Sequence, residues 1–91
     1  MYIDPVSKME EKIGKVFKYF KEPSVAAIKI ESGKLTIGDK VHFKGENTDF
    51  QQEITSMEIE GDEVEEVGPG DDVGIKVKER VRPNDEVIKL S

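Results

Sequence analysis

The stretch Gly38-Asp39-Lys40-Val41 returns three more times along the chain with small changes. The other copies are Gly61-Asp62-Glu63-Val64, Gly70-Asp71-Asp72-Val73 and Asn84-Asp85-Glu86-Val87. Gly and Asn accept the positive φ that a tight turn requires, and an Asp side chain can hydrogen-bond to the backbone of its own turn. A Val after the turn favours a strand with that side chain directed inward. This turn motif therefore predicts four turns that each lead into a β-strand.

Between these turns, apolar residues alternate with polar ones, most clearly at Val73, Ile75 and Val77. Such alternation is typical of a strand with one buried face. Leu35 and Ile37 are expected to fold beneath the turn that contains them and to plug the core. We count six short strands and no helix longer than one turn. The sequence therefore predicts an all-β fold, a six-stranded closed Greek-key β-barrel, because closure removes exposed strand edges.

The segment from Phe50 to Ile59 breaks the alternation in its middle. Phe50 and Ile54 share one face of an extended strand, whereas Met57 and Ile59 fall on the other. A shift of one residue turns every later side chain to the opposite face of the sheet. We therefore predict one long strand with a β-bulge near Thr55.

The chain has 91 residues, enough for one domain with one core and too few for a deep cleft between two domains. We divide it into an N-terminal arm, residues 1–11, and a barrel, residues 12–91. For the arm, a short helical turn and a mobile or covering extended segment both stay open.

Charge is unevenly distributed along the chain. The net charge is −6, from 14 basic and 20 acidic residues, which argues against a general binder of nucleic acid or anionic membrane. Residues 1–45 contain nine Lys and six acidic residues, a net charge of +3. Residues 46–91 contain five basic and fourteen acidic residues, a net charge of −9. The two halves of the chain are therefore expected to face different partners.

Other features of the composition exclude several classes of protein. There is no Cys, so disulfides and thiol chemistry are excluded. No apolar run approaches the roughly 18 residues of a membrane span, and the N-terminus lacks the pattern of a signal peptide. We therefore predict a cytoplasmic protein without a membrane partner. Abundant Lys and Glu without Cys are typical of thermophile proteins.

The sequence offers little for catalysis. His42 is the only His, lies on the outward phase of a predicted strand, and has no nucleophile-elbow motif elsewhere to complete a triad. The acidic pairs lie beside glycines in turns that we expect to be wet, and the EF-hand order is absent. We therefore predict no enzyme activity, no resident metal and no cofactor.

Two surfaces are the candidate binding sites. Lysines mixed with aromatic residues near the N-terminus resemble the composition of single-strand RNA binders, because cations contact phosphate and aromatic rings stack on bases. The acidic loop 58–66 is instead expected to dock a basic protein surface. The RNA-binding candidates are Lys15, Lys18, Lys29 and Lys44, and the docking candidates are Glu58, Glu60, Asp62, Glu63, Glu65 and Glu66.

Motifs spread over residues 12–90 resemble the second domain of elongation factor Tu. The motifs are Gly14-x-Val16, Gly33-x-Leu35-x-x-Gly38-Asp39-x-Val41, Ile54-Thr55-Ser56-Met57, Pro69-Gly70-Asp71-Asp72-Val73-Gly74 and Asn84-Asp85-Glu86-Val87. The resemblance implies a β-barrel of the translation-factor second-domain type. The residues that it implies for structural turns are Gly33, Gly38, Asp39, Gly70, Gly74, Asn84 and Asp85.

The chain also departs from that family and is similar to a second one. It contains no Gly-x4-Gly-Lys-Ser/Thr loop, so it does not hydrolyse nucleotides by itself. Where elongation factor Tu has a basic, aromatic loop, residues 58–66 are acidic. The region from Tyr19 to Ile30 and the strand Val41-x-Phe43 are similar to the C-terminal module of collagenase-like peptidases.

These observations predict a stand-alone, non-catalytic module that acts as an adaptor in translation. Its expected partner is RNA or a basic protein of the ribosome or tRNA machinery. The alternative is a detached accessory domain of a collagenase-like peptidase-type enzyme, which binds protein partners through its acidic loop.

Overall fold

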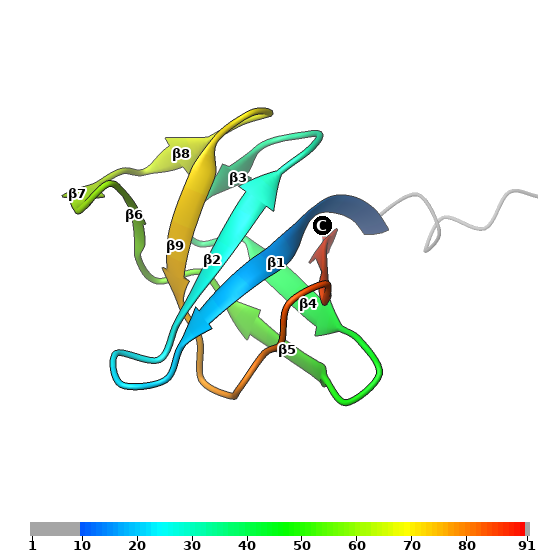
Figure 1. Cartoon of the computed structure of the whole chain (residues 1–91). Helices are drawn as coiled ribbons and strands as arrows, with labels where there is room; N and C mark the ends of the chain where they lie inside the picture. Colours follow the sequence, from blue (N-terminus) through cyan, green and yellow to red (C-terminus); the bar gives the residue numbers. More distant parts are fainter. Residues whose placement is uncertain (1–9, 91) are drawn as a thin grey trace, which may run out of the picture.

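The computed structural model describes residues 10–90, and Figure 1 shows their course. Most of the predicted arm, including both alternatives for its conformation, lies outside the described residues. Its last two positions, Glu10 and Glu11, belong to the first strand, β1 (Glu10–Phe20). The strand therefore starts two residues before the predicted domain boundary.

Residues 10–90 form ten strands and no helix. Eight strands make one antiparallel sheet in the order β5-β4-β10-β1-β2-β9-β6-β7, and β3 pairs with β8 in a second, small sheet. After β1 the strands are β2 (Val25–Ile30), β3 (Leu35–Thr36), β4 (Lys40–Lys44), β5 (Asp49–Glu53), β6 (Met57–Ile59), β7 (Asp62–Glu63), β8 (Glu66–Val67), β9 (Asp72–Lys76) and β10 (Glu86–Leu90).

The large sheet curls around the core, and in Figure 1 β4 and β5 lie at the lower right, with β4 passing behind β1. Its backbone ladder ends at β5 and β7 among the described strands. The Gln52 side chain links β5 to the end of β9 and the residues just after it, because its amide donates to the Lys76 carbonyl at 2.9 Å and accepts from the Lys78 N–H at 2.9 Å. The all-β prediction is confirmed, whereas the six-stranded closed barrel is not, since eight strands form a ladder with two edges.

The core lies inside the curled sheet and consists mostly of aliphatic side chains. The Phe43 and Phe50 rings stack within it at a centroid distance of 5.1 Å. The alternation at Val73, Ile75 and Val77 holds, because all three side chains are buried. Burial of this kind is the main favourable contribution to folding of a small domain.

Two expectations about the middle of the chain need correction. The segment from Phe50 to Ile59 is not one bulged strand but two strands, because the chain leaves β5 after Glu53 and joins the opposite end of the sheet as β6. A strand break and a bulge produce the same phase shift in the sequence. Ile37 does not plug the core beside buried Leu35, since 38% of it is exposed.

Three copies of the turn motif share one hydrogen-bonded structure, which we call the Asp-clamped turn. The Asp carboxylate accepts from the N–H three residues earlier, and the Asp N–H donates to the carbonyl of that same residue. The carboxylate distances are 2.8 Å for Thr36 to Asp39, 2.8 Å for Gly68 to Asp71 and 2.8 Å for Arg82 to Asp85, and the reverse main-chain distances are 3.0, 3.1 and 3.1 Å. The residues before each Asp have positive φ, 98° at Gly38, 93° at Gly70 and 78° at Asn84.

The fourth copy folds differently. Glu60 and Gly61 both have positive φ, 52° and 85°, and form a two-residue turn between β6 and β7. Ile59 pairs across this turn with Asp62, whose side chain is exposed. Two consecutive positive φ values are typical of the type I′ turn that suits the twist of a hairpin.

The remaining glycines have separate roles. Gly33 has a φ of 71°, in the turn between β2 and β3. Gly74 is not a turn residue, contrary to the expectation, because it lies inside β9 opposite Ala27. At Gly14, an added Cβ would lie 2.2 Å from the Lys29 carbonyl oxygen, so β1 and β2 approach closely only without a side chain there.

Candidate functional site

The register of the sheet places three of the predicted RNA-binding lysines in one row. Lys44 lies opposite Glu86, Glu86 opposite Lys15, and Lys15 opposite Lys29. The row continues to Asp49 at one end and to Asp72 at the other. This charge row crosses six strands with three lysines and three acidic residues, so it carries no net charge at neutral pH.

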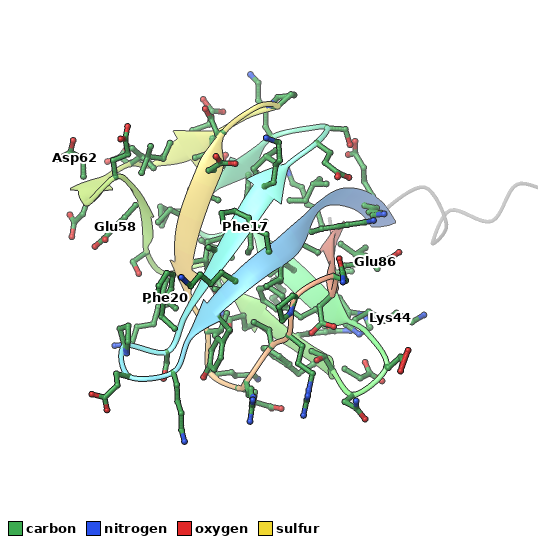
Figure 2. The ribbon with its side chains drawn as sticks, in the orientation of Figure 1. Phe17, Phe20, Lys44, Glu58, Asp62 and Glu86 are labelled. Carbon is green, nitrogen blue, oxygen red and sulfur yellow. The ribbon has the colours of Figure 1, made fainter. Side chains whose placement is uncertain are left out.

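One ion pair joins two residues of the row, and a second joins Glu86 of the row to Lys12, which lies outside it. The Lys29 ammonium lies 3.8 Å from the Asp72 carboxylate, and Glu86 lies 3.6 Å from Lys12. Figure 2 shows Lys44 and Glu86 on the same side of the molecule. Phosphate binding depends on cations that are free to replace counterions. The row therefore offers less to RNA than its lysines suggest when they are counted along the sequence.

The fourth lysine candidate lies apart from the row, in an aromatic setting. The Lys18 ammonium lies 5.0 Å from the centroid of the Phe20 ring, a cation–π arrangement. Phe20 is 42% exposed and Phe17 is 51% exposed, and Figure 2 shows both on β1. Phe17 is the unpaired residue where the β1–β2 register shifts between Val16 and Lys18. A β-bulge redirects a side chain in this way.

The acidic docking candidates come together at the other end of the sheet. Figure 2 shows Glu58 and Asp62 on the β6–β7 hairpin, away from Lys44 and Glu86. All six candidates are exposed, and within residues 10–90 the one cation that pairs with any of them is Lys34, 4.0 Å from Glu66. We call residues 58–66 the acidic hairpin. Unlike the charge row, it keeps most of its negative charge.

A hollow lies at the base of the acidic hairpin, with a volume of about 270 Å³. Its apolar wall includes the exposed part of Ile37, and Glu63 and Glu65 form part of its rim. The Ile37 N–H donates to the Glu65 carbonyl at 3.1 Å, which fixes the two segments beside each other. The lining residues are Ile37, Thr55, Ser56, Met57, Glu63, Val64 and Glu65. A hollow lined by three apolar residues and two glutamates suits a side chain that is both apolar and cationic.

His42, which was considered for catalysis, and the hydroxyl group of Ser32 both have structural partners. His42 on β4 contacts the Asp49 carboxylate on the neighbouring strand β5. The Ser32 hydroxyl donates to the Lys12 carbonyl at 3.0 Å. Among residues 10–90, no three acidic or His side chains come together as a metal-binding group, and no helix is long and apolar enough to cross a membrane.

Sequence reasoning missed Ile37 as a surface residue, whereas it counted the aromatic residues near the N-terminal lysines, Phe17 among them, toward an RNA-binding face. Both occupy positions where apolar residues are normally buried, and their exposure follows from a bulge and from a turn that depend on distant strands. Leu35 lies two positions before Ile37 and Tyr19 two positions after Phe17, so the local alternation carries no signal of their exposure.

These features define a small antiparallel β-domain in which three strands follow Asp-clamped turns. Residues 24–82 match the family model of elongation factor Tu domain 2, and the chain belongs to this family. The predicted relationship to elongation factor Tu is therefore confirmed.

The chain is also similar to parts of peptidases. It is 38% identical over 79 residues to a collagenase of Porphyromonas gingivalis, a match that covers 86% of this chain and 22% of the collagenase. It is 37% identical over 79 residues to an uncharacterized protease of Methanocaldococcus jannaschii, with 86% and 19% covered. The chain thus spans about a fifth of the length of these relatives.

The structural comparison gives the same relationship. The C-terminal domain of a Geobacillus thermoleovorans protein described as a U32 peptidase has a TM-score of 0.82 and 26% identity, and the match covers 99% of this chain and 100% of that domain. A selenomethionine variant of the same domain has a TM-score of 0.79 and 29% identity, with 87% and 98% covered. The chain is homologous to a C-terminal domain of the U32 peptidases.

Proposed function

We propose that this chain is a non-catalytic binding module of a U32 peptidase-type protein and that it holds a protein partner at the acidic hairpin. The homology to the C-terminal domain of such peptidases is the observation that carries the proposal. The chain corresponds to about a fifth of the relatives' length. A binding role for this part would complement a catalytic role of the remaining part. This is the alternative that the sequence left open.

The two candidate surfaces differ in a way that favours a protein partner over RNA. The charge row is neutral, because every lysine in it has an acidic cross-strand neighbour or ion-pair partner. The acidic hairpin repels phosphate and attracts Lys and Arg side chains. Its hollow adds apolar contact, which long-range charge alone does not supply. We infer a partner segment that contains both basic and apolar side chains.

An NMR titration of the labelled chain with a pentapeptide that alternates lysine and leucine tests this proposal. We expect shifts at Ile37, Met57 and Val64, and weaker binding at high salt, because surface charges are screened. The double variant Glu63→Lys/Glu65→Lys is expected to bind about tenfold more weakly at low salt. The control Glu79→Lys/Glu46→Lys changes net charge equally at exposed positions outside the hairpin and is expected to bind almost as well.

Three outcomes would overturn the proposal. Equal losses of peptide binding in the hairpin variant and in the control would show that binding depends on net charge alone. A titration with bulk tRNA that shifts Lys15, Lys18 and Lys29, and that Lys15→Glu/Lys18→Glu/Lys29→Glu abolishes, would restore the RNA adaptor. Cleavage of gelatin by the purified chain would contradict the non-catalytic role.

A further inference from the structure

Residues 76–78, which are the last residue of β9 and the two that follow it, present backbone groups on two sides. One side bonds to the main chain, and the other bonds to a side chain. On the first side, the Val77 N–H donates to the Ser24 carbonyl at 2.9 Å, beside β2. On the other side, the Lys76 carbonyl and the Lys78 N–H bond to the Gln52 amide, each at 2.9 Å. A carbonyl and an N–H that flank one residue form the pair with which a strand bonds its neighbour. The Gln52 amide thus takes the place of the N–H and C=O that one residue of a neighbouring strand would present.

A gap separates β5 from this segment. No main-chain hydrogen bond joins β5 to residues 76–78 in the described chain. Neighbouring strands lie about 4.8 Å apart, and a glutamine side chain with its hydrogen bond spans more than one such spacing. The gap contains a hollow of about 430 Å³, lined by Gln52, Glu53, Thr55, Lys76, Val77 and Lys78. An extended main chain would enter this hollow beside residues 76–78, with Gln52 turned outward.

We propose that this gap binds a short, extended, acidic polypeptide segment as an added strand. Its backbone would take over the two hydrogen bonds of the Gln52 amide, because a residue of an extended strand offers its own N–H and C=O on the same edge. Lys76 and Lys78 are exposed and form no ion pair within residues 10–90, whereas Val77 is buried between them. The segment therefore has acidic side chains facing out beside these lysines and one small apolar side chain facing in.

This site is separate from the acidic hairpin and goes beyond the proposed function. The hairpin selects a basic segment by charge, whereas the gap selects an extended backbone with acidic flanks. Neither surface contributes a lining residue to the other except Thr55, which lies in the crossing segment between β5 and β6. The two proposals can therefore fail independently.

The probe is a blocked pentapeptide with the order threonine, glutamate, valine, glutamate, threonine, titrated into labelled protein and followed by NMR. We expect shifts at residues 51–54 and 76–78 and a shift of the Gln52 side-chain amide as it is released. The variant Gln52→Ala removes the competing amide and is expected to bind about fivefold more tightly, the effect of one neutral hydrogen bond. Gln51→Ala is the matched control, because this exposed neighbour does not bond to residues 76–78, and is expected to bind like the unchanged protein.

A second probe keeps the test decisive if Gln52→Ala does not fold. The same peptide with a methyl group on the valine nitrogen cannot donate that hydrogen bond and is expected to lose binding to the unchanged protein. Equal binding of the methylated peptide, equal binding of a lysine-for-glutamate peptide, or no shift at residues 76–78 at millimolar peptide would each overturn the proposal.

Discussion

The three Asp-clamped turns and the acidic hairpin use the same four-residue motif and build different structures from it. At Asp39, Asp71 and Asp85 the carboxylate turns back to the chain and accepts a backbone N–H. At Asp62 the residue is paired in a hairpin ladder and its side chain faces solvent. The first residue of the motif has a positive φ in all four places, and the fourth copy differs by a second positive φ, at Glu60.

The largest difference between the two kinds of turn is expected for Asp85→Ala. Asp85 is 4% exposed, accepts from the Arg82 N–H, and packs so tightly that a Cβ on Gly45 would lie within bonding range of its carboxylate. Losing this carboxylate leaves a backbone donor without its partner and a cavity beside Gly45. We expect a loss of about 3 kcal/mol in the free energy of unfolding, measured by chemical denaturation. A loss below 0.5 kcal/mol would show that the clamp does not stabilise the turn.

The next effect concerns backbone conformation at the turns. Gly38 has a φ of 98° with no atom within 4 Å of an added Cβ, so Gly38→Val tests conformational strain without a clash. A β-branched residue resists this φ, and we expect a loss of about 2 kcal/mol. Gly61→Asn in the hairpin is the contrasting change, since Asn tolerates positive φ, and it should cost a few tenths of a kcal/mol. Equal thermal melting of Gly38→Val and the unchanged protein would contradict the strain.

A smaller loss is expected at the half-buried clamp. Asp71→Ala removes the acceptor for the Gly68 N–H, and Asp71 itself is nearer to solvent than Asp85. We expect a loss of about 1 kcal/mol, and Asp71→Asn should recover part of it because the amide oxygen still accepts. Denaturation curves of the two variants measure this. If Asn behaves no better than Ala, then the hydrogen bond is not what stabilises the turn.

The smallest effect is expected at the hairpin itself. Asp62→Ala removes an exposed carboxylate with no hydrogen bond or ion pair in the part of the chain that the structure describes. Unfolding should change by no more than about 0.5 kcal/mol. Binding of the lysine–leucine peptide should weaken, since a negative charge is lost near the hollow. A large loss of stability would make the hairpin a structural element and weaken its role as a docking surface.

The sequence was most informative where structure depends on neighbouring residues. The positive φ at Gly38, Gly70 and Asn84 follows from the turn motif alone, and so does the inward Val that comes after each of them. The all-β class follows from the alternation between the turns. These features need no knowledge of which strands pair.

Features that depend on strand pairing were less accessible. Lys15, Lys29, Glu86 and Asp72 are far apart in the chain, and only the register of the sheet reveals that their charges cancel. The break after Glu53 was interpreted as a bulge because both produce one phase shift. For Gln52, nothing local distinguishes an amide that spans a gap from a solvated one.

The order of strands also limits when this domain can fold during synthesis. β1 lies at the middle of the sheet between β2 and β10, so the first described strand pairs with the last. A ribosome adds about 5–20 residues per second, and β1 must wait for residues 86–90 to emerge before its second edge is covered. Such distant pairings also slow folding of the released chain. A nascent chain halted before Val87 is therefore expected to expose an open edge of β1 to chaperones and to other nascent chains.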